Sequence, residues 1–124
     1  IGMNILVRDI HMHTKFPQNI FKMSVHQLSS DFAIMVYEDD IFQLHLDATY
    51  AKHPLLGLLP ENPPRGAVIE IQLFQPDRDE CHLRAVEHNA TILHAPQYKP
   101  HGLRECAILS HDGYVWVPFR PLEV

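Results

Sequence analysis

The order of apolar and polar residues predicts short strands and two amphipathic helices. Segments that are rich in β-branched and aromatic residues, and that in several cases alternate with polar residues, are typical of half-buried strands. The predicted strands are residues 4–8, 23–28, 32–37, 41–46, 67–74, 91–95, 104–109 and 114–119. The polar segments 29–31, 38–40 and 111–113 are predicted as turns, because Ser, Asp and Gly favour turn conformations.

Each predicted helix follows the first strand of its half and begins after an aspartate. Asp9 is a good N-cap for a helix over residues 10–16, and Pro17 is expected to leave that helix short or kinked. Asp77 precedes a second helix over residues 78–88, and Glu80 stands three residues later, the spacing of a capping box. The chain therefore predicts the order βαβββ twice.

The outward and inward faces of the second helix follow from a period of 3.6 residues. Ala85, His82, Val86 and Leu83 fall on one face, and we expect Leu83 and Val86 to pack on the sheet against Ile69 and Ile71. Asn89 is the expected C-terminal cap, because asparagine tolerates the left-handed conformation.

The repeated order defines the domain organisation. We predict an α+β fold in which residues 1–124 form one domain of two βαβββ modules, at 3–47 and 67–124. Residues 48–66 hold four prolines and two glycines and are predicted as a linker, a functional loop or crossover between the modules.

Polar side chains share one face of two predicted strands. Gln43 and His45 alternate with apolar residues in one strand, and Glu70 and Gln72 do so in another. Because successive side chains of a strand point to opposite faces, each pair is expected on a solvated face. These four residues are the predicted polar lining of a ligand cleft.

Three further residues are candidates for the same cleft. Val115 and Val117 are expected to face it if Trp116 packs under a helix, since the two faces alternate. Arg104 and Glu105 alternate as well, so one of them faces the cleft. Arg104 could steer an anionic ligand there, and an ion pair within the fold is an equally good explanation for it.

Charge and composition narrow the function classes. The chain has 10 Lys and Arg against 15 Asp and Glu, a formal net charge of −5. No basic face is implied, so a nucleic-acid partner is not expected, and the acidic balance suits a cationic ligand better. The sequence holds no serine-hydrolase elbow, P-loop or dinucleotide fingerprint.

The two cysteines and the hydropathy of the chain indicate where in the cell the protein is expected. Cys81 and Cys106 form no CxxC pair, which favours a reducing, cytoplasmic location and leaves a single bridge open. Cys106 lies in an apolar strand and is expected to be a small buried hydrophobe. No apolar run approaches the roughly 18 residues of a membrane span, and the first residues lack the features of a signal peptide.

The order of elements and several short motifs together resemble the vicinal-oxygen-chelate superfamily. The motifs are Val7-Arg8-Asp9 with Phe16–Phe21, Asp77-Arg78-Asp79, His101–Glu105 and the hairpin Ser110–Trp116. This superfamily includes glyoxalase I, bleomycin-resistance proteins, fosfomycin-resistance enzymes and extradiol dioxygenases. The resemblance covers nearly the whole chain and implies two curved sheets that form a concave cleft.

The resemblance also implies where a divalent metal would bind in metal-dependent members. The four ligand positions correspond here to Gly2, His45, Glu70 and Val117, of which only His45 and Glu70 can ligate. Because a catalytic metal site needs about three protein ligands, we expect no metal cofactor.

Two hypotheses for the function follow from the resemblance. The first is a metal-free protein that sequesters a polar or cationic small molecule in a cleft at a homodimer interface, like the bleomycin-resistance branch. The second is a metal-dependent lyase, epimerase or dioxygenase that uses Zn, Ni, Mn or Fe on His45, Glu70 and a further ligand. Whether the chain is an enzyme stays open at this point.

Overall fold

A computed structural model describes residues 1–60, 62–74, 76–100 and 102–121. The chain divides into two compact units, Ile1–Asn62 and Pro63–Val124. Each unit contains one βαβββ set of elements, so the predicted α+β fold with two βαβββ modules is confirmed. Residues 48–62 of the predicted linker belong to the first unit, and residues 63–66 belong to the second.

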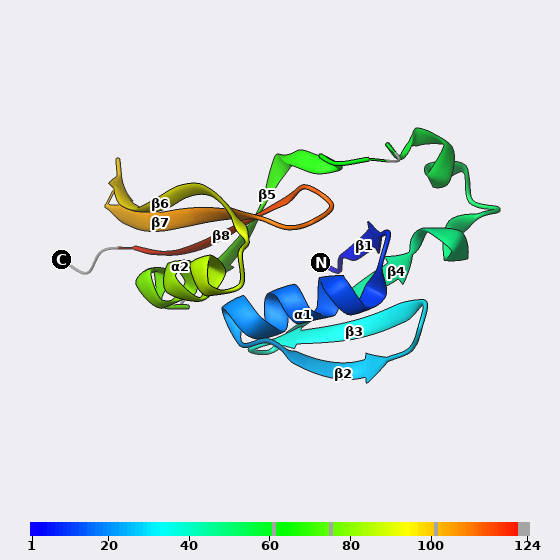
Figure 1. The fold of residues 1–124 in the computed structure, drawn as a ribbon, viewed down its shortest axis with the longest axis horizontal. Coiled ribbons are helices and arrows are strands. Elements are labelled where there is room, and N and C mark those ends of the chain that lie inside the picture. Colours follow the sequence, from blue (N-terminus) through cyan, green and yellow to red (C-terminus); the bar gives the residue numbers. More distant parts are fainter. Residues whose placement is uncertain (61, 75, 101, 122–124) are drawn as a thin grey trace. The chain divides into compact units, whose positions relative to one another are not determined.

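The first unit is a four-stranded mixed sheet with a helix on one face. Its elements in chain order are β1 (Asn4–Val7), α1 (Ile10–Phe21), β2 (Ser24–Leu28), β3 (Phe32–Tyr37) and β4 (Asp40–Leu46). The strand order is β1-β4-β3-β2, with β1 parallel to β4 and the other pairs antiparallel. Figure 1 shows α1 running along this sheet.

The core of the first unit lies between α1 and one face of the sheet. Val7, Ala33 and Met35 have no exposed surface, and Leu44 is 2% exposed. α1 buries every third or fourth residue, which is the stripe that an amphipathic helix presents to a sheet. These residues are Ile10, His13, Thr14, Pro17, Ile20 and Phe21, with Phe16 beside them.

α1 does not end before Pro17, so the predicted end at Phe16 is wrong. The helix continues to Phe21 and ends at Lys22, which has φ 59° and donates its backbone N–H to the Pro17 carbonyl. An internal proline removes one helical hydrogen bond and costs about 3 kcal/mol. The burial of Ile20 and Phe21 beyond it offsets that cost, because each large apolar side chain contributes about 1.5–3 kcal/mol.

Two short 3-10 helices follow β4. η1 spans Asp47–Tyr50 and η2 spans Pro54–Leu58, so most of the predicted linker in the first unit is folded into tight turns. His53 caps η2, because its side chain accepts the backbone N–H of Leu55.

The second unit repeats the topology of the first. Its elements are β5 (Gly66–Phe74), α2 (Arg78–Glu87), β6 (Thr91–Lys99), β7 (Leu103–Leu109) and β8 (Tyr114–Pro121). The strand order is β5-β8-β7-β6, and β5 and β8 are parallel (Figure 1). β6 is longer than the predicted 91–95, and its register with β7 shifts on both sides of His94.

The start of β5 is fixed to the turn between β7 and β8. Arg65 and Asp112 form an ion pair of 3.9 Å whose side chains are almost fully buried. Gly113 has φ 82°, and a Cβ added there would lie 2.4 Å from Cα of Pro64. Gly113 therefore serves both the turn and the close passage of the chain that enters β5.

The predicted caps of α2 are confirmed. Asp77 accepts the Glu80 backbone N–H at 3.0 Å, and this bond holds the pKa of Asp77 below its ordinary value. Asn89 follows the helix with φ 57°.

The predicted inner face of α2 is correct for Ala85, which is buried, and wrong for Leu83 and Val86. Leu83 and Val86 are 66% and 54% exposed, and Ile69 is 69% exposed, so these side chains do not form the expected contact. The buried residues of α2 are Arg78, Cys81 and Ala85. Small Cys and Ala side chains let the helix approach a sheet that already supplies large ones, and the apolar period alone did not reveal this.

Two alanine substitutions, one at an exposed position of α2 and one at a buried position of the sheet, test the corrected packing of the helix. Leu83→Ala should change the free energy of unfolding by less than about 0.5 kcal/mol, because the side chain is mostly exposed. Ile108→Ala, in a fully buried position of β7, should cost about 2–5 kcal/mol. Urea unfolding of both variants measures the difference, and a larger loss for Leu83→Ala than for Ile108→Ala would contradict the packing.

Candidate functional site

The face of the first sheet that points away from α1 carries polar and aromatic side chains. Residues that are partners across neighbouring strands share a face. Asn4 is the partner of Gln43, and His45 is the partner of both Leu6 and Phe32. The structure therefore places the predicted residues Gln43 and His45 on one half-buried face, and it adds Asn4 and Phe32 to them.

A row of four rings crosses this face. His45 lies edge-on to Phe32 and Tyr50, with ring centroids 5.1 and 5.5 Å apart, and Tyr50 is 5.1 Å from His53. We call these four residues the ring row. The amide of Asn4 donates to the Tyr50 hydroxyl at 3.5 Å, and Nε2 of His45 lies 2.9 Å from Oε1 of Gln43. Aromatic faces beside two side-chain amides suit a flat molecule with polar edges.

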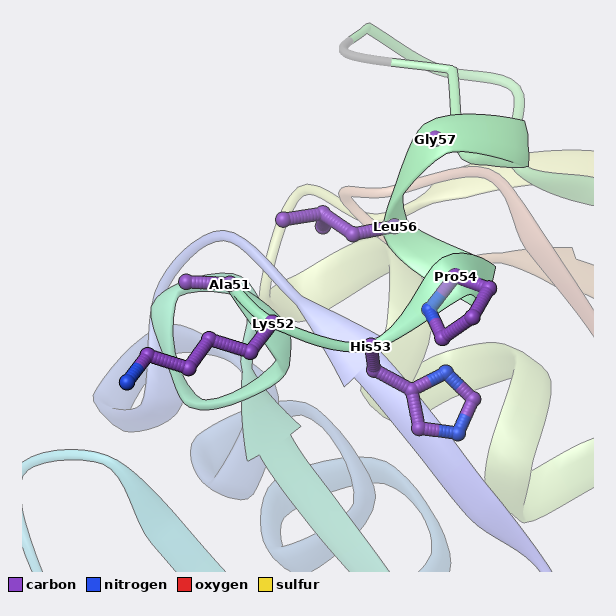
Figure 2. Close-up of a pocket in the computed structure, with 6 residues that line it drawn as sticks. All are labelled: Ala51, Lys52, His53, Pro54, Leu56 and Gly57. Atoms are coloured by element: carbon purple, nitrogen blue, oxygen red, sulfur yellow. The ribbon is translucent and has the colours of Figure 1, made fainter.

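The turn after the ring row borders a shallow hollow of about 530 Å³. Its lining residues are Ala51, Lys52, His53, Pro54, Leu56 and Gly57 (Figure 2). Figure 2 shows the side chains of Lys52 and His53 extending in different directions from this turn. Nδ1 of His53 accepts the Leu55 N–H at 2.9 Å, so Nε2 carries the ring hydrogen of the neutral side chain.

In the second unit, the sheet face opposite α2 has an apolar middle and polar margins. The middle is a buried cluster of Ala107, Val115, Val117 and Phe119. On the β5 side, Glu70 is the partner of Val115 and Gln72 is the partner of Val117, and both polar side chains are exposed. The predicted residues Glu70, Gln72, Val115 and Val117 thus share one face.

The other margin of this face carries a histidine and a glutamate that the sequence prediction did not include. His94 on β6 is the partner of Ala107, and Glu105 on β7 is the partner of Phe119. Nε2 of His94 lies 3.8 Å from Oε1 of Glu105, and the side chains are 28% and 13% exposed. The alternation of Arg104 and Glu105 was the available signal, and it left open which of the two residues lies on this face.

Arg104 lies on the opposite face, with α2. It donates to Asp79 at 2.9 Å, and its guanidinium lies 4.6 Å from the centroid of the Tyr98 ring. The hydrogen bond to Asp79 raises the pKa of Arg104 above its ordinary value. Of the two explanations for Arg104 that the sequence left open, the geometry favours the ion pair within the fold.

The four positions expected for a metal do not fit a catalytic divalent ion. Gly2 precedes β1 and has no donor, and Val117 is apolar and fully buried. His45 is the register partner of Leu6 on β1, and its Nε2 lies 2.9 Å from the Gln43 amide oxygen. Within the described ranges, no group of three or more His, Cys, Asp or Glu side chains could hold a metal.

The two cysteines are free and fully buried on the α2 side of the second unit. Burial raises the pKa of Cys81 to about 11 and that of Cys106 to about 12. A neutral buried thiol is a poor nucleophile, which agrees with the expected packing role of Cys106.

Comparison with solved structures shows which known proteins have a similar fold. An enzyme of the glyoxalase/bleomycin resistance protein/dioxygenase family from Burkholderia phytofirmans is similar over 98% of this chain and 97% of its own, with a TM-score of 0.82 and 16% identity. The chain has the glyoxalase/bleomycin-resistance fold. This finding confirms the fold that the sequence resemblance implied.

Two further proteins with this fold are named for different activities. The fosfomycin resistance protein FosX from Mesorhizobium loti matches 97% of the chain and 91% of its own length, with a TM-score of 0.70 and 14% identity. A lactoylglutathione lyase from Agrobacterium tumefaciens has the same coverages and TM-score at 15% identity. No protein-family model matches the chain, and no curated protein does. In the described part of the chain, no helix has the length and apolar content needed to cross a membrane.

The ring tautomers of two histidines test the site geometry. His53 should be protonated on Nε2, because Nδ1 accepts a backbone N–H. His94 should be protonated on Nδ1, because that atom lies 3.1 Å from the Ala95 carbonyl, which can only accept. Ring nitrogen chemical shifts recorded at about pH 8, above the pKa of an unperturbed imidazole, distinguish the two forms. Identical tautomers at the two positions would contradict the geometry.

Proposed function

We propose that the chain is a small-molecule-binding protein of the glyoxalase/bleomycin-resistance superfamily that works without a metal. It sequesters a polar or cationic ligand, as a resistance protein does, and it binds the ligand as a homodimer. The observation that carries this proposal is the ring row with the amides of Asn4 and Gln43 at its side. A flat ligand stacks on the rings, and the amides fix its orientation.

Charge supports a cationic rather than an anionic ligand. The formal net charge of the chain is −5, and a negative potential raises the local concentration of cations. Exposed Glu70 and half-buried Glu105 place carboxylates on one face of the second unit. The free thiols of Cys81 and Cys106 suit the reducing conditions of the cytoplasm, where we place the protein.

The competing function is a metal-dependent lyase, epimerase or dioxygenase of the same superfamily. It needs His45 and Glu70 as ligands together with further donors. The two functions predict different metal contents. A metal-dependent enzyme holds a bound ion, whereas two ligands alone do not form a tight site for a divalent ion.

Metal analysis separates the two functions. Protein purified without chelator should contain less than about a tenth of an equivalent of Zn, Ni, Mn or Fe, because its donor set is incomplete. With Zn or Mn added, His45→Ala and Glu70→Ala should show the same change in Tm as the unmodified protein, since no bound ion is lost. Near-stoichiometric metal that disappears in either variant would instead establish the metal-dependent reading.

A further inference from the structure

His94 and Glu105 meet at the margin of the second sheet without a hydrogen bond between them. The 3.8 Å separation of Nε2 and Oε1 is longer than the 2.7–3.2 Å that an N–H···O bond requires. Both residues lie on the sheet face that carries Glu70 and Gln72. They come from adjacent antiparallel strands, so the backbone holds the two side chains close together.

Two acceptors face each other across this gap when His94 is neutral. The Ala95 carbonyl fixes the ring hydrogen on Nδ1, which leaves a lone pair on Nε2. The carboxylate of Glu105 also only accepts hydrogen bonds. No further hydrogen bond or ion pair involves either side chain in the described residues.

Burial makes this arrangement costly without a donor. The Glu105 side chain is 13% exposed, and a largely buried acceptor that lacks a partner costs about 1–3 kcal/mol, more if it is charged. Lys99 is the partner of Leu103 on this face, and among the described residues no ion pair joins its ammonium to Glu105. The gap is therefore complementary to a cationic donor that comes from outside the fold.

We propose that His94 and Glu105 bind the protonated amine of a ligand. An ammonium group donates one hydrogen bond to Nε2 of His94 and another to Oε1 of Glu105, and its charge is matched by the carboxylate. Ala107 and Phe119, the register partners of these two residues, are buried beside them and hold the two strands in place. This inference deepens the proposed function, on which it rests, by naming the ligand as an amine.

A metal ion fits the gap less well than an ammonium. One imidazole and one carboxylate supply two ligands, whereas a tight divalent site uses three or four. No third His, Cys, Asp or Glu joins them within the described ranges.

Titration with benzylamine, observed by amide NMR at about pH 8, tests the proposal. This pH lies above the pKa of an unperturbed imidazole and below that of a primary alkylamine such as benzylamine, which is therefore a cation. Saturable shift changes should centre on His94 and Glu105. Benzyl alcohol, a neutral probe of the same shape, should bind about tenfold more weakly, because it offers no charged donor.

Two charge-matched variants complete the experiment. Glu105→Gln keeps the size of the side chain and should weaken benzylamine binding about tenfold. Glu87→Gln makes the same change at an exposed position of α2 and should leave binding unaltered. The proposal would be overturned if the two variants changed benzylamine binding equally, or if benzyl alcohol bound as tightly as benzylamine. The absence of saturable shift changes would overturn it as well.

The outcome also distinguishes this inference from the proposed function. Shifts that centre on Gln43, His45 and Tyr50, and that survive Glu105→Gln, would refute the amine site and leave the ring row as the binding surface. Stoichiometric metal on His45 and Glu70 would refute the proposed function, while binding of benzylamine at His94 and Glu105 would remain a property of the second unit.

Discussion

The parallel pairing of the first and last strands is the constraint on which each unit depends. β1 pairs with β4, and β5 pairs with β8, so the ends of each βαβββ segment lie at neighbouring positions of one sheet. A parallel pair requires a long crossover connection, and here the helix and two further strands provide it. The pairing brings Asn4 beside Gln43 and Gln72 beside Val117, although each pair is far apart in the sequence.

The two faces of each sheet also differ in role: one packs against a helix, and the other carries the candidate binding residues. In each sheet, one face is covered by a helix and carries buried apolar residues, and in the second sheet the opposite face holds a further buried apolar cluster. The opposite face of the first sheet carries the ring row, and that of the second carries carboxylates and a histidine around an apolar middle. Function therefore depends on the side chains that alternate with the core, a division that lets one fold serve different ligands.

Much of the fold and part of the candidate site could be predicted from the sequence. Alternation in residues 41–46 and 67–74 placed Gln43, His45, Glu70 and Gln72 on the correct faces, because a period of two residues is a property of any strand. Asp9 and Asp77 marked both helix starts, since an N-cap is a local interaction.

The errors arose where tertiary packing overrode a local rule. Pro17 stays inside α1 because large side chains beyond it are buried, and α2 turns Cys81 and Ala85 inward because the sheet already fills the interface. Tyr50 and His53 lie in the candidate site because of the path of the two 3-10 helices. No hydrophobic periodicity in the sequence predicts that path. The sequence alone could not tell which of Arg104 and Glu105 faces away from α2. The hydrogen bond between Arg104 and Asp79 decides it.

A fragment screen on the labelled full chain tests the central claim most directly, namely that the sheet faces opposite the helices bind small molecules without a metal. Amide shifts should map aromatic and amine fragments to the ring row and to the face that carries His94 and Glu105, equally in chelator and in added zinc. Fragments that bind only with zinc, or that collect around exposed Leu83 and Val86 on α2, would contradict the account.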